Sequence, residues 1–182
     1  MTVLAVDVGG TSLRAALVRR DVILHRARAA TRPGPVAGQL AELIGGLLRA
    51  NPDDPPEAVG VGVPEYVHAG VVTSSEVVEW TPGTVDRIRS AVAEVVDAAV
   101  PWVVEADVRC GAVAEHARLE DPDRMSLLYV SWGTGLSSSF VLPGGRAWPG
   151  ARGEALALGE WRADPRPRRG EPRSRRAGRR AS

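Results

Sequence analysis

The sequence predicts an α/β fold whose first lobe opens with three antiparallel strands and continues with alternating helices and strands. Short runs of apolar residues mark the three strands, at Val3–Val8, Leu13–Arg19 and Val22–Ala29. Such runs, each four to nine residues long and separated by turns, are typical of consecutive hairpins. Helical spacing of apolar residues begins only after this series, which places the helices later in the chain.

The strand series ends at Pro33-Gly34-Pro35, which cannot continue a strand or a helix. Beyond it the pattern alternates between helical and strand spacing. The expected elements are, in order, a helix over Val36–Ala50, a buried strand over Ala58–Val63, a helix over Thr84–Ala99, a strand over Trp102–Glu105, a helix over Asp107–Leu119 and a strand that starts at Leu127. Three hairpin strands followed by this alternation fit a ribonuclease-H-like lobe.

Composition and charge divide the chain into three parts. Asp121-Pro122-Asp123 is a candidate boundary, so we expect a first lobe over 1–121, the start of a second lobe over 122–161 and a tail over 162–182. The tail holds 9 of the 23 arginines against two acidic residues, and it lacks Leu, Ile, Val, Met and aromatic residues. It cannot bury enough apolar surface to offset chain entropy, so we expect it to be disordered.

Two glycine-centred turns, each between two apolar runs, are the first candidate functional features. They are Gly9-Gly10-Thr11 and Gly133-Thr134-Gly135. A backbone without Cβ atoms can approach a phosphate closely and point its N–H groups at the oxygens, and a threonine hydroxyl adds a donor. A plain hairpin explains either turn alone. The pair together indicates a nucleotide phosphate held between two hairpins.

Asp7 strengthens this interpretation of the first turn. It lies two residues before the glycines, at the end of a buried strand. A carboxylate there is costly unless it is paired or meets a metal. Beside a phosphate loop, Asp7 is a candidate ligand for Mg²⁺, either directly or through water.

A second acidic site lies in Glu105-Ala106-Asp107, where a strand ends and a helix begins. A rigid strand aims side chains at such a junction, and the helix N-terminus stabilises negative charge. Asp107 is therefore a candidate general base that accepts a hydroxyl proton. Asp is also a good helix N-cap, which is the alternative role for Asp107.

The motifs in order resemble those of the ROK family of sugar kinases and repressors, within the actin-like ATPase superfamily. The resemblance covers Met1 to about Trp161 and is carried by AVDVGGTSLRAAL, GVGVPEYVHAGVVTSSEVVEW, VVEADVRCGAVAEH, YVSWGTGLSSSFVLPGG and GARGEALALGEW. It implies an actin-type ATPase lobe with an incomplete second lobe, and ATP-dependent phosphorylation of a hexose or amino sugar in a cleft between lobes.

The resemblance also implies roles for individual residues. Asp107 matches the family's catalytic base, and Asp7 is placed to assist Mg²⁺. The residues implied in binding the ATP phosphates are Asp7, Gly9, Gly10 and Thr11 on one side and Gly133, Thr134 and Gly135 on the other. Full-length relatives are expected to form homodimers in some cases.

Several positions in the implied sugar site depart from the family. Glu76 and Ala106 each stand where a sugar-contacting Asn is usual. Ala157 replaces a sugar-binding Glu, and Glu160 replaces a His that binds both sugar and zinc. Glu154 is a candidate substitute carboxylate, although a surface glutamate is the simpler interpretation. The family's cysteine-rich zinc loop is absent, and His25, His68 and His116 lack metal-ligand spacing, so we expect no zinc.

Composition excludes several other classes. The single cysteine, Cys110, rules out an intramolecular disulfide and a multi-cysteine zinc site. No apolar run is long enough to span a bilayer, and the chain enters a strand at once without a signal peptide pattern, so we expect a cytoplasmic protein without membrane contact. The basic tail lacks aromatic residues and a recognition fold. We therefore expect non-specific nucleic-acid contact at most, and no specific nucleic-acid partner.

The expected function is that of a ROK-type sugar kinase in a truncated and inactive form, with ATP and a small sugar as ligands where activity exists. A non-catalytic sugar- or nucleotide-binding regulator is the alternative. The change from family-like sequence to an Arg-, Pro-, Gly- and Ser-rich tail occurs without a linker after Trp161. An out-of-frame reading of GC-rich DNA would produce such a change, and an evolved flexible tail is the competing explanation.

Overall fold

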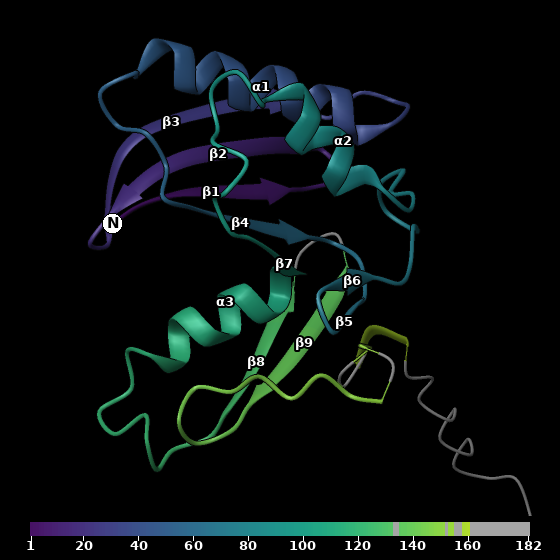
Figure 1. Ribbon diagram of the computed structural model, residues 1–182. Coiled ribbons are helices and arrows are strands. Elements are labelled where there is room, and N and C mark those ends of the chain that lie inside the picture. Colours follow the sequence, from purple (N-terminus) through teal and green to yellow (C-terminus); the bar gives the residue numbers. More distant parts are fainter. Residues whose placement is uncertain (133–134, 152, 155–157, 161–182) are drawn as a thin grey trace, which may run out of the picture.

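The computed structural model describes residues 1–132, 135–151, 153–154 and 158–160. Its elements are β1 (Thr2–Val8), β2 (Ser12–Arg19), β3 (Val22–Ala30), α1 (Val36–Ala50), β4 (Ala58–Val63), β5 (Val67–His68), β6 (Val71–Val72), α2 (Thr84–Ala91), β7 (Trp102–Ala106), α3 (Asp107–His116), β8 (Leu127–Trp132), β9 (Leu136–Val141) and a short 3-10 turn, η1 (Leu158–Glu160) (Figure 1). The predicted tail, 162–182, and the residues Gly133 and Thr134 lie outside the described residues.

The central sheet has the order β3-β2-β1-β4-β7. β1 pairs with β2 and β2 with β3 in antiparallel fashion, whereas β4 is parallel to both β1 and β7. The predicted mixed sheet with three consecutive antiparallel strands is therefore confirmed. Because β1, β4 and β7 run the same way, their carboxyl ends meet at one edge of the sheet.

The core lies between this sheet and α1 with α2, which cover the same face (Figure 1). Alternate residues of β1 point into it, so Leu4, Val6 and Val8 are buried while Ala5 between them is exposed. Helix α1 presents Leu40, Ile44 and other apolar side chains to that face. The helical and strand periodicities read from the sequence thus meet in one apolar layer.

Helix α2 is shorter than the sequence pattern predicts. It ends at Ala91 rather than near Ala99, and the chain continues as a series of turns to Val100. The apolar stripe nevertheless packs as expected, with Ile88, Val92 and Val96 buried. β-branched valines crowd this stretch, and the Asp97 carboxylate accepts a hydrogen bond from the Ala99 N–H, which favours a turn over another helical turn.

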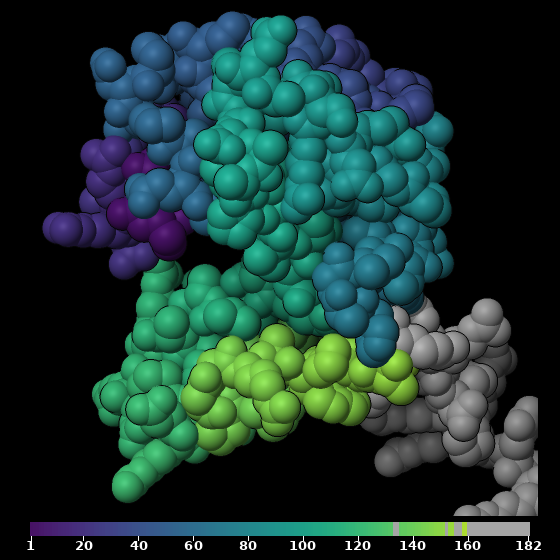
Figure 2. All heavy atoms as spheres, in the orientation of Figure 1, coloured from purple at the N-terminus to yellow at the C-terminus, as the bar shows by residue number. Residues whose placement is uncertain are grey.

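The other face of the sheet meets α3, which in turn packs against the β8–β9 hairpin. The Tyr129 ring of β8 lies against Gly111 of α3, where a Cβ atom would come within 3.2 Å of the tyrosine hydroxyl. Figure 2 shows α3, the hairpin and the segment after it as a lower body that joins the upper one at the centre of the view and is set apart by a gap from the N-terminal strands on one side. A small second hairpin, β5–β6, turns at Ala69 and Gly70, both with positive φ.

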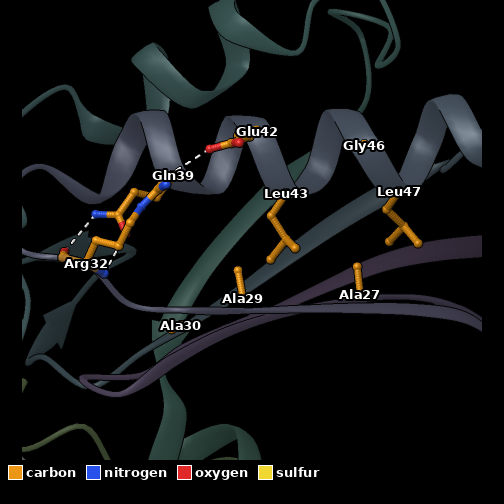
Figure 3. A pocket seen from close by; sticks show the side chains of 9 residues that line it. All are labelled: Ala27, Ala29, Ala30, Arg32, Gln39, Glu42, Leu43, Gly46 and Leu47. Atoms are coloured by element: carbon orange, nitrogen blue, oxygen red, sulfur yellow. Dashed lines mark hydrogen bonds and ion pairs between the residues drawn. The ribbon is translucent and has the colours of Figure 1, made fainter.

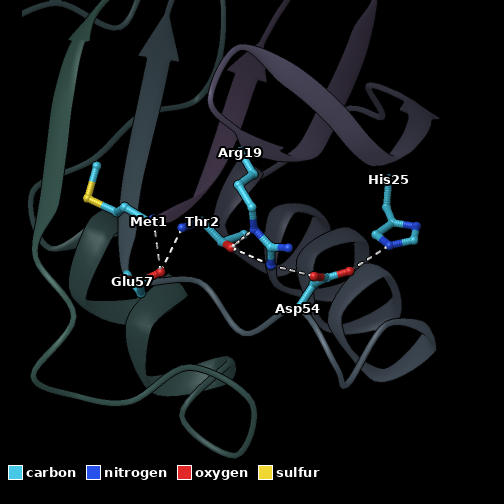
Figure 4. A network of polar contacts seen from close by, with 6 residues as sticks. All are labelled: Met1, Thr2, Arg19, His25, Asp54 and Glu57. Atoms are coloured by element: carbon cyan, nitrogen blue, oxygen red, sulfur yellow. Dashed lines mark hydrogen bonds and ion pairs between the residues drawn. The ribbon is translucent and has the colours of Figure 1, made fainter.

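A polar network connects the start of β1 with the last residue of β2 and the first half of β3 (Figure 4). Asp54 accepts a hydrogen bond from the Arg19 guanidinium at 2.6 Å and pairs with the His25 ring at 2.9 Å. The His25 contact and the Arg19 charge hold the pKa of Asp54 below its ordinary value. His25 therefore pairs with a carboxylate at the margin of the sheet.

None of the helices in the described residues combines the length and apolar character that crossing a membrane requires.

Candidate active site

The candidate site is built on the carboxyl ends of three neighbouring parallel strands. Asp7 lies in β1 opposite Gly62 of β4, and Gly62 lies opposite Glu105 of β7. Asp107 follows β7 directly, and a Cβ atom on Gly62 would lie 3.6 Å from the Asp107 Cα. Sheet register thus brings Asp7 and Asp107, which are a hundred residues apart in sequence, to opposite sides of one glycine.

The turn after Asp7 is braced by a residue that sequence analysis did not single out. The Thr31 hydroxyl donates a hydrogen bond to the Gly9 carbonyl at 2.6 Å, and the Thr31 N–H donates to the Thr11 carbonyl at 3.1 Å. Gly10 packs against Val77, where a Cβ atom would come within 3.0 Å of a valine methyl group. The Gly9-Gly10-Thr11 turn is therefore held rigidly and lies beside the loop that carries Glu76.

Positive charge surrounds Asp7 on its face of the sheet. The Arg14 guanidinium donates to the Asp7 carboxylate at 3.1 Å, and Arg28 of β3 lies directly opposite Arg14 in the register. With Arg26, these side chains line a hollow of about 700 Å³. Like charges in a directly opposed cross-strand pair repel each other. A phosphate group near Asp7 would relieve that repulsion.

Asp107 occupies the first turn of α3, but it is not the helix N-cap. The N-cap position belongs to Ala106, which has extended backbone angles and no capping side chain. The structure therefore overturns the N-cap alternative. The Asp107 carboxylate accepts a hydrogen bond from the neighbouring Val108 N–H, which leaves further acceptor capacity on its oxygens.

The environment of Asp107 strengthens it as a base. Partial withdrawal from water raises the pKa of its carboxyl above the ordinary value, the Val108 hydrogen bond opposes this, and the charges of Asp7 and Glu65 raise it further. A carboxylate destabilised in this way takes up a proton more readily than an exposed one. Asp107 thus has the electrostatics that a proton acceptor needs.

Glu65 is a buried carboxylate to which sequence analysis assigned no role. It is 4 % exposed and accepts hydrogen bonds from the Ser74 hydroxyl and from three backbone N–H groups. These N–H groups belong to Glu76, Val77 and Val78, at 2.7–3.0 Å. Burial alone would raise the pKa of Glu65, but the four hydrogen bonds outweigh it and hold the pKa below its ordinary value. Glu65 fixes the 74–78 loop beside the glycine turn.

A cavity of about 290 Å³ joins Asp107 to the later part of the chain. Pro64, Glu65, Tyr66, Ala106 and Asp107 line it from the first lobe, and Gly135, Ser137, Gly153 and Glu154 line it from the β8–β9 region and beyond. Of the predicted site residues, the cavity gathers Asp107, Ala106, Gly135 and Glu154. Asp7, Gly9, Gly10, Thr11 and Glu76 are not among its lining residues. Gly133, Thr134 and the Glu160 side chain lie outside the described part of the chain.

Arg109 is a further residue of this region that sequence analysis missed. Its side chain is 3 % exposed, lines the cavity and forms an ion pair with Glu105 at 2.7 Å. Only long-range structure reveals it, because its other acceptors come from distant segments. His116 is likewise buried, and its Nε2 contacts the Met125 carbonyl at 2.8 Å.

A larger cavity of about 460 Å³ lies far from these carboxylates, between α1 and β3 (Figure 3). Alanine and leucine side chains form its walls, including Ala27, Ala29 and Leu43. The polar residues at its mouth bond each other, with Arg32 paired to Glu42 and to Gln39. Its lining contains no Ser, Thr, Cys or His, so we interpret it as a packing gap at the edge of the sheet.

The donor set suits Mg²⁺ bound together with phosphate, but not a metal held by protein alone. Among the described residues, no three His, Cys, Asp or Glu side chains come together as a metal site. Mg²⁺ in phosphoryl-transfer sites is commonly held by one or two carboxylates together with the substrate phosphates. Asp7, at the end of β1 beside the glycine turn, meets that requirement.

The family profile described as ROK family matches residues 3–172, which continues past Trp161 into the arginine-rich segment. Among curated protein sequences, none matches this chain significantly.

Solved structures agree with the profile. A candidate sugar kinase from Cytophaga hutchinsonii is 24% identical with a TM-score of 0.71, and the match covers 88% of this chain and 54% of that one. A ROK family glucokinase from Streptomyces griseus, in complex with glucose and AMPPNP, is 22% identical with a TM-score of 0.65, covering 85% and 48%. A ROK family transcriptional regulator, a homologue of the Escherichia coli MLC protein, is 20% identical with a TM-score of 0.70, covering 84% and 39%.

These likenesses establish the actin-like ATPase fold of the first lobe. The chain spans about half the length of the solved structures it matches.

Proposed function

Because this chain belongs to the ROK family, we propose that it carries the phosphate-binding and base-bearing half of an ATP-dependent sugar kinase. The observation that carries the proposal is the placement of Asp7 and Asp107 around Gly62, at the carboxyl ends of parallel strands. Ligands in open α/β sheets bind at such edges. The likeness to a glucokinase crystallised with glucose and AMPPNP supports a sugar and a nucleotide as ligands.

In this proposal, Asp107 accepts the proton of a sugar hydroxyl as that oxygen attacks the terminal phosphorus of ATP, while the bond from this phosphorus to the bridging oxygen breaks and ADP leaves. Its raised pKa suits the task, because a stronger base takes the proton more readily in the transition state. The Gly9-Gly10-Thr11 turn lies against the ATP phosphates on one side, and Gly133, Thr134 and Gly135 lie on the other. Mg²⁺ bound to the phosphates and to Asp7 would neutralise charge that develops on the transferred group.

The sugar pocket of this branch differs from that of its family. Ala106 has no group that can hydrogen-bond a sugar, and Glu76 brings a carboxylate where an amide is usual. Glu154, which lines the cavity with Asp107, is proposed as a replacement acceptor for sugar hydroxyls, and Glu160 as a further contact. These changes alter which hexose or amino sugar fits, so the sugar is to be identified by a substrate panel.

The experiment that tests the base is Asp107→Ala in a complete relative with the same N-terminal sequence. We expect turnover to fall by about 10²–10⁴-fold, the usual effect of losing a general base. Affinity for ATP should change little, because the glycine turns and not Asp107 hold the phosphates. Unchanged turnover in this variant removes Asp107 from the role of base.

A non-catalytic regulator is the second candidate, and the TM-score of 0.70 to a ROK family transcriptional regulator favours keeping it. The two candidates differ in one measurement. A regulator binds sugar or nucleotide without sugar-dependent ATP consumption even when the complete protein is assayed. A kinase consumes ATP in proportion to the sugar added.

A further inference from the structure

Arg109 is a buried arginine one turn into α3, two residues after Asp107. Its Nη1 donates hydrogen bonds to the Val67 carbonyl at 2.9 Å and to a Glu105 carboxylate oxygen at 2.7 Å. Its Nη2 donates to the carbonyls of Pro149, at 3.4 Å, and Gly153. One guanidinium therefore joins three segments that are far apart in sequence: β5, the β7–α3 junction and the 149–154 segment.

Stability alone is a poor explanation for this arrangement. Burying an arginine costs free energy, and its single ion pair, with the partly exposed Glu105, offsets only part of that cost. The other three acceptors are neutral backbone carbonyls. The planar fork of a guanidinium is suited to holding several fixed acceptors at once, which a lysine ammonium on a flexible stem is not.

Gly153 reinforces the same junction from the other side. Its φ is +91°, and a Cβ atom there would lie 2.5 Å from the Val67 carbonyl oxygen. That oxygen is the one that accepts the hydrogen bond from Arg109. Only glycine fits such a close approach of two backbones, so β5, α3 and the 149–154 segment meet at one point.

We propose that Arg109 is a positioning residue, which docks the 149–154 segment onto the first lobe and so places Glu154 in the cavity it shares with Asp107. The inference rests on the proposed function, because it gives Glu154 the sugar-binding task left open by Ala157. Arg109 does not contact the sugar in this account. It acts through the backbone of Gly153, the residue that precedes Glu154.

Hydrogen–deuterium exchange on this polypeptide tests the docking without any ligand. Arg109→Lys keeps the charge but cannot reach all four acceptors, and Gly153→Ala breaks the backbone contact while Arg109 stays intact. Both variants should speed amide exchange in 149–154 by about tenfold or more, the effect of losing one charge-assisted hydrogen bond. Exchange in β1, β2 and β4 should stay unchanged. The matched control is Arg118→Lys, which changes an exposed arginine two residues after the end of α3.

Calorimetric titration with D-glucose and with N-acetyl-D-mannosamine then tests the purpose of the docking. Arg109→Lys should weaken sugar binding about as much as Glu154→Gln, and the double variant should lose little more, because both changes remove one contact. Unchanged exchange in 149–154 in both Arg109→Lys and Gly153→Ala overturns the docking role. If exchange rises as expected but the wild-type chain binds neither sugar, the docking role stands and the proposed sugar site fails. If the losses of sugar affinity add up in the double variant, Arg109 and Glu154 act independently, and the positioning role is overturned.

Discussion

Two carboxylates near the glycine turn have pKa values displaced in opposite directions. Withdrawal from water and the charges of Asp7 and Glu65 raise the pKa of Asp107. Four hydrogen bonds hold the pKa of Glu65 below its ordinary value despite its burial. Opposite displacement of neighbouring acids is a common arrangement where one group must hold structure and another must exchange a proton. Substitutions of the two residues are therefore expected to change the free energy of unfolding in opposite directions.

Asp107→Asn should raise the free energy of unfolding at pH 7. The folded-state pKa of Asp107 lies above its unfolded value, so the ionised side chain destabilises the fold at pH values above the folded pKa. That cost disappears as the pH falls to the unfolded pKa, where both states hold the proton. Urea unfolding at several pH values should therefore show a gain for the variant that shrinks on acidification. A gain that stays constant with pH contradicts the assigned environment.

Glu65→Gln should lower the free energy of unfolding at pH 7 by about 2–3 kcal/mol, because a charged acceptor of four hydrogen bonds is replaced by a neutral one. The folded-state pKa of Glu65 is depressed, so its contribution is present above the unfolded pKa and is lost as the pH falls through the folded pKa. The difference in free energy of unfolding between the variant and the wild type should therefore become smaller at acid pH. Glu79→Gln, an exposed change on the same segment, serves as the control and should have little effect at any pH.

Among the elements, those with a local signature were predictable from sequence. The three N-terminal strands, α1 and β4 were predicted within a residue or so, because their apolar periods depend only on neighbours in the chain. The end of α2 was not, since competing turns at Val92–Val100 decided it. The β5–β6 hairpin was missed although Ala69-Gly70 between short apolar pairs carried a weak turn signal.

The site divides in the same way. Asp7 and Asp107 could be singled out because each stands at a strand end beside a recognisable motif. Glu65 and Arg109 carried no such mark, because their roles depend on acceptors and donors brought from 9–44 residues away. Buried polar residues of this kind become visible only when the fold assembles their partners.

The β8–β9 hairpin exposes one apolar face. Leu128 is 52% exposed and Trp132 is 89% exposed, and Leu128 lines a shallow apolar hollow with Phe140, Leu142 and Trp148. In the described residues this two-stranded sheet has no further strand on either edge. Ala147 forms a bridge to Val141 on the β9 side, whereas no described residue pairs with the other edge of β8. An exposed apolar face beside an unpaired strand edge favours association.

We predict that the isolated polypeptide self-associates through this face. The double substitution Leu128→Thr with Val130→Thr keeps β-propensity while removing apolar surface, so it should shift sedimentation velocity profiles towards the monomer. Val103→Thr changes an exposed valine of similar accessibility on β7, at the edge of the central sheet, and should leave the profile unchanged. Equal association in all three proteins contradicts the assignment of the face.

At the scale of the whole molecule, α3 and the segments around the shared cavity join the sheet to the hairpin in the part of the chain that the structure describes. A phosphoryl-transfer site of this kind depends on positioning and on charges gathered around the phosphates, because the protein does little covalent chemistry. In the proposed function, one wall of such a site would be formed by the glycine turn, Asp7, Asp107 and the cavity beside Glu154. The chain spans about half the length of the structures it matches.

The last prediction is that the 182-residue polypeptide, expressed as printed, does not sustain sugar-dependent ATP consumption. The residues after Trp161 contain no apolar side chain larger than alanine apart from proline, and from this composition we expect them not to supply the packed helices and strands that close a nucleotide cleft. The test is an ATP-consumption assay across hexoses and amino sugars, with the Streptomyces griseus ROK family glucokinase as the positive control under the same conditions. Robust turnover by the purified polypeptide would falsify the prediction. Reading the coding DNA beyond codon 161 in all three frames gives an independent check. If none of the three frames encodes second-lobe motifs, the proposal that a longer kinase sequence underlies this chain is contradicted.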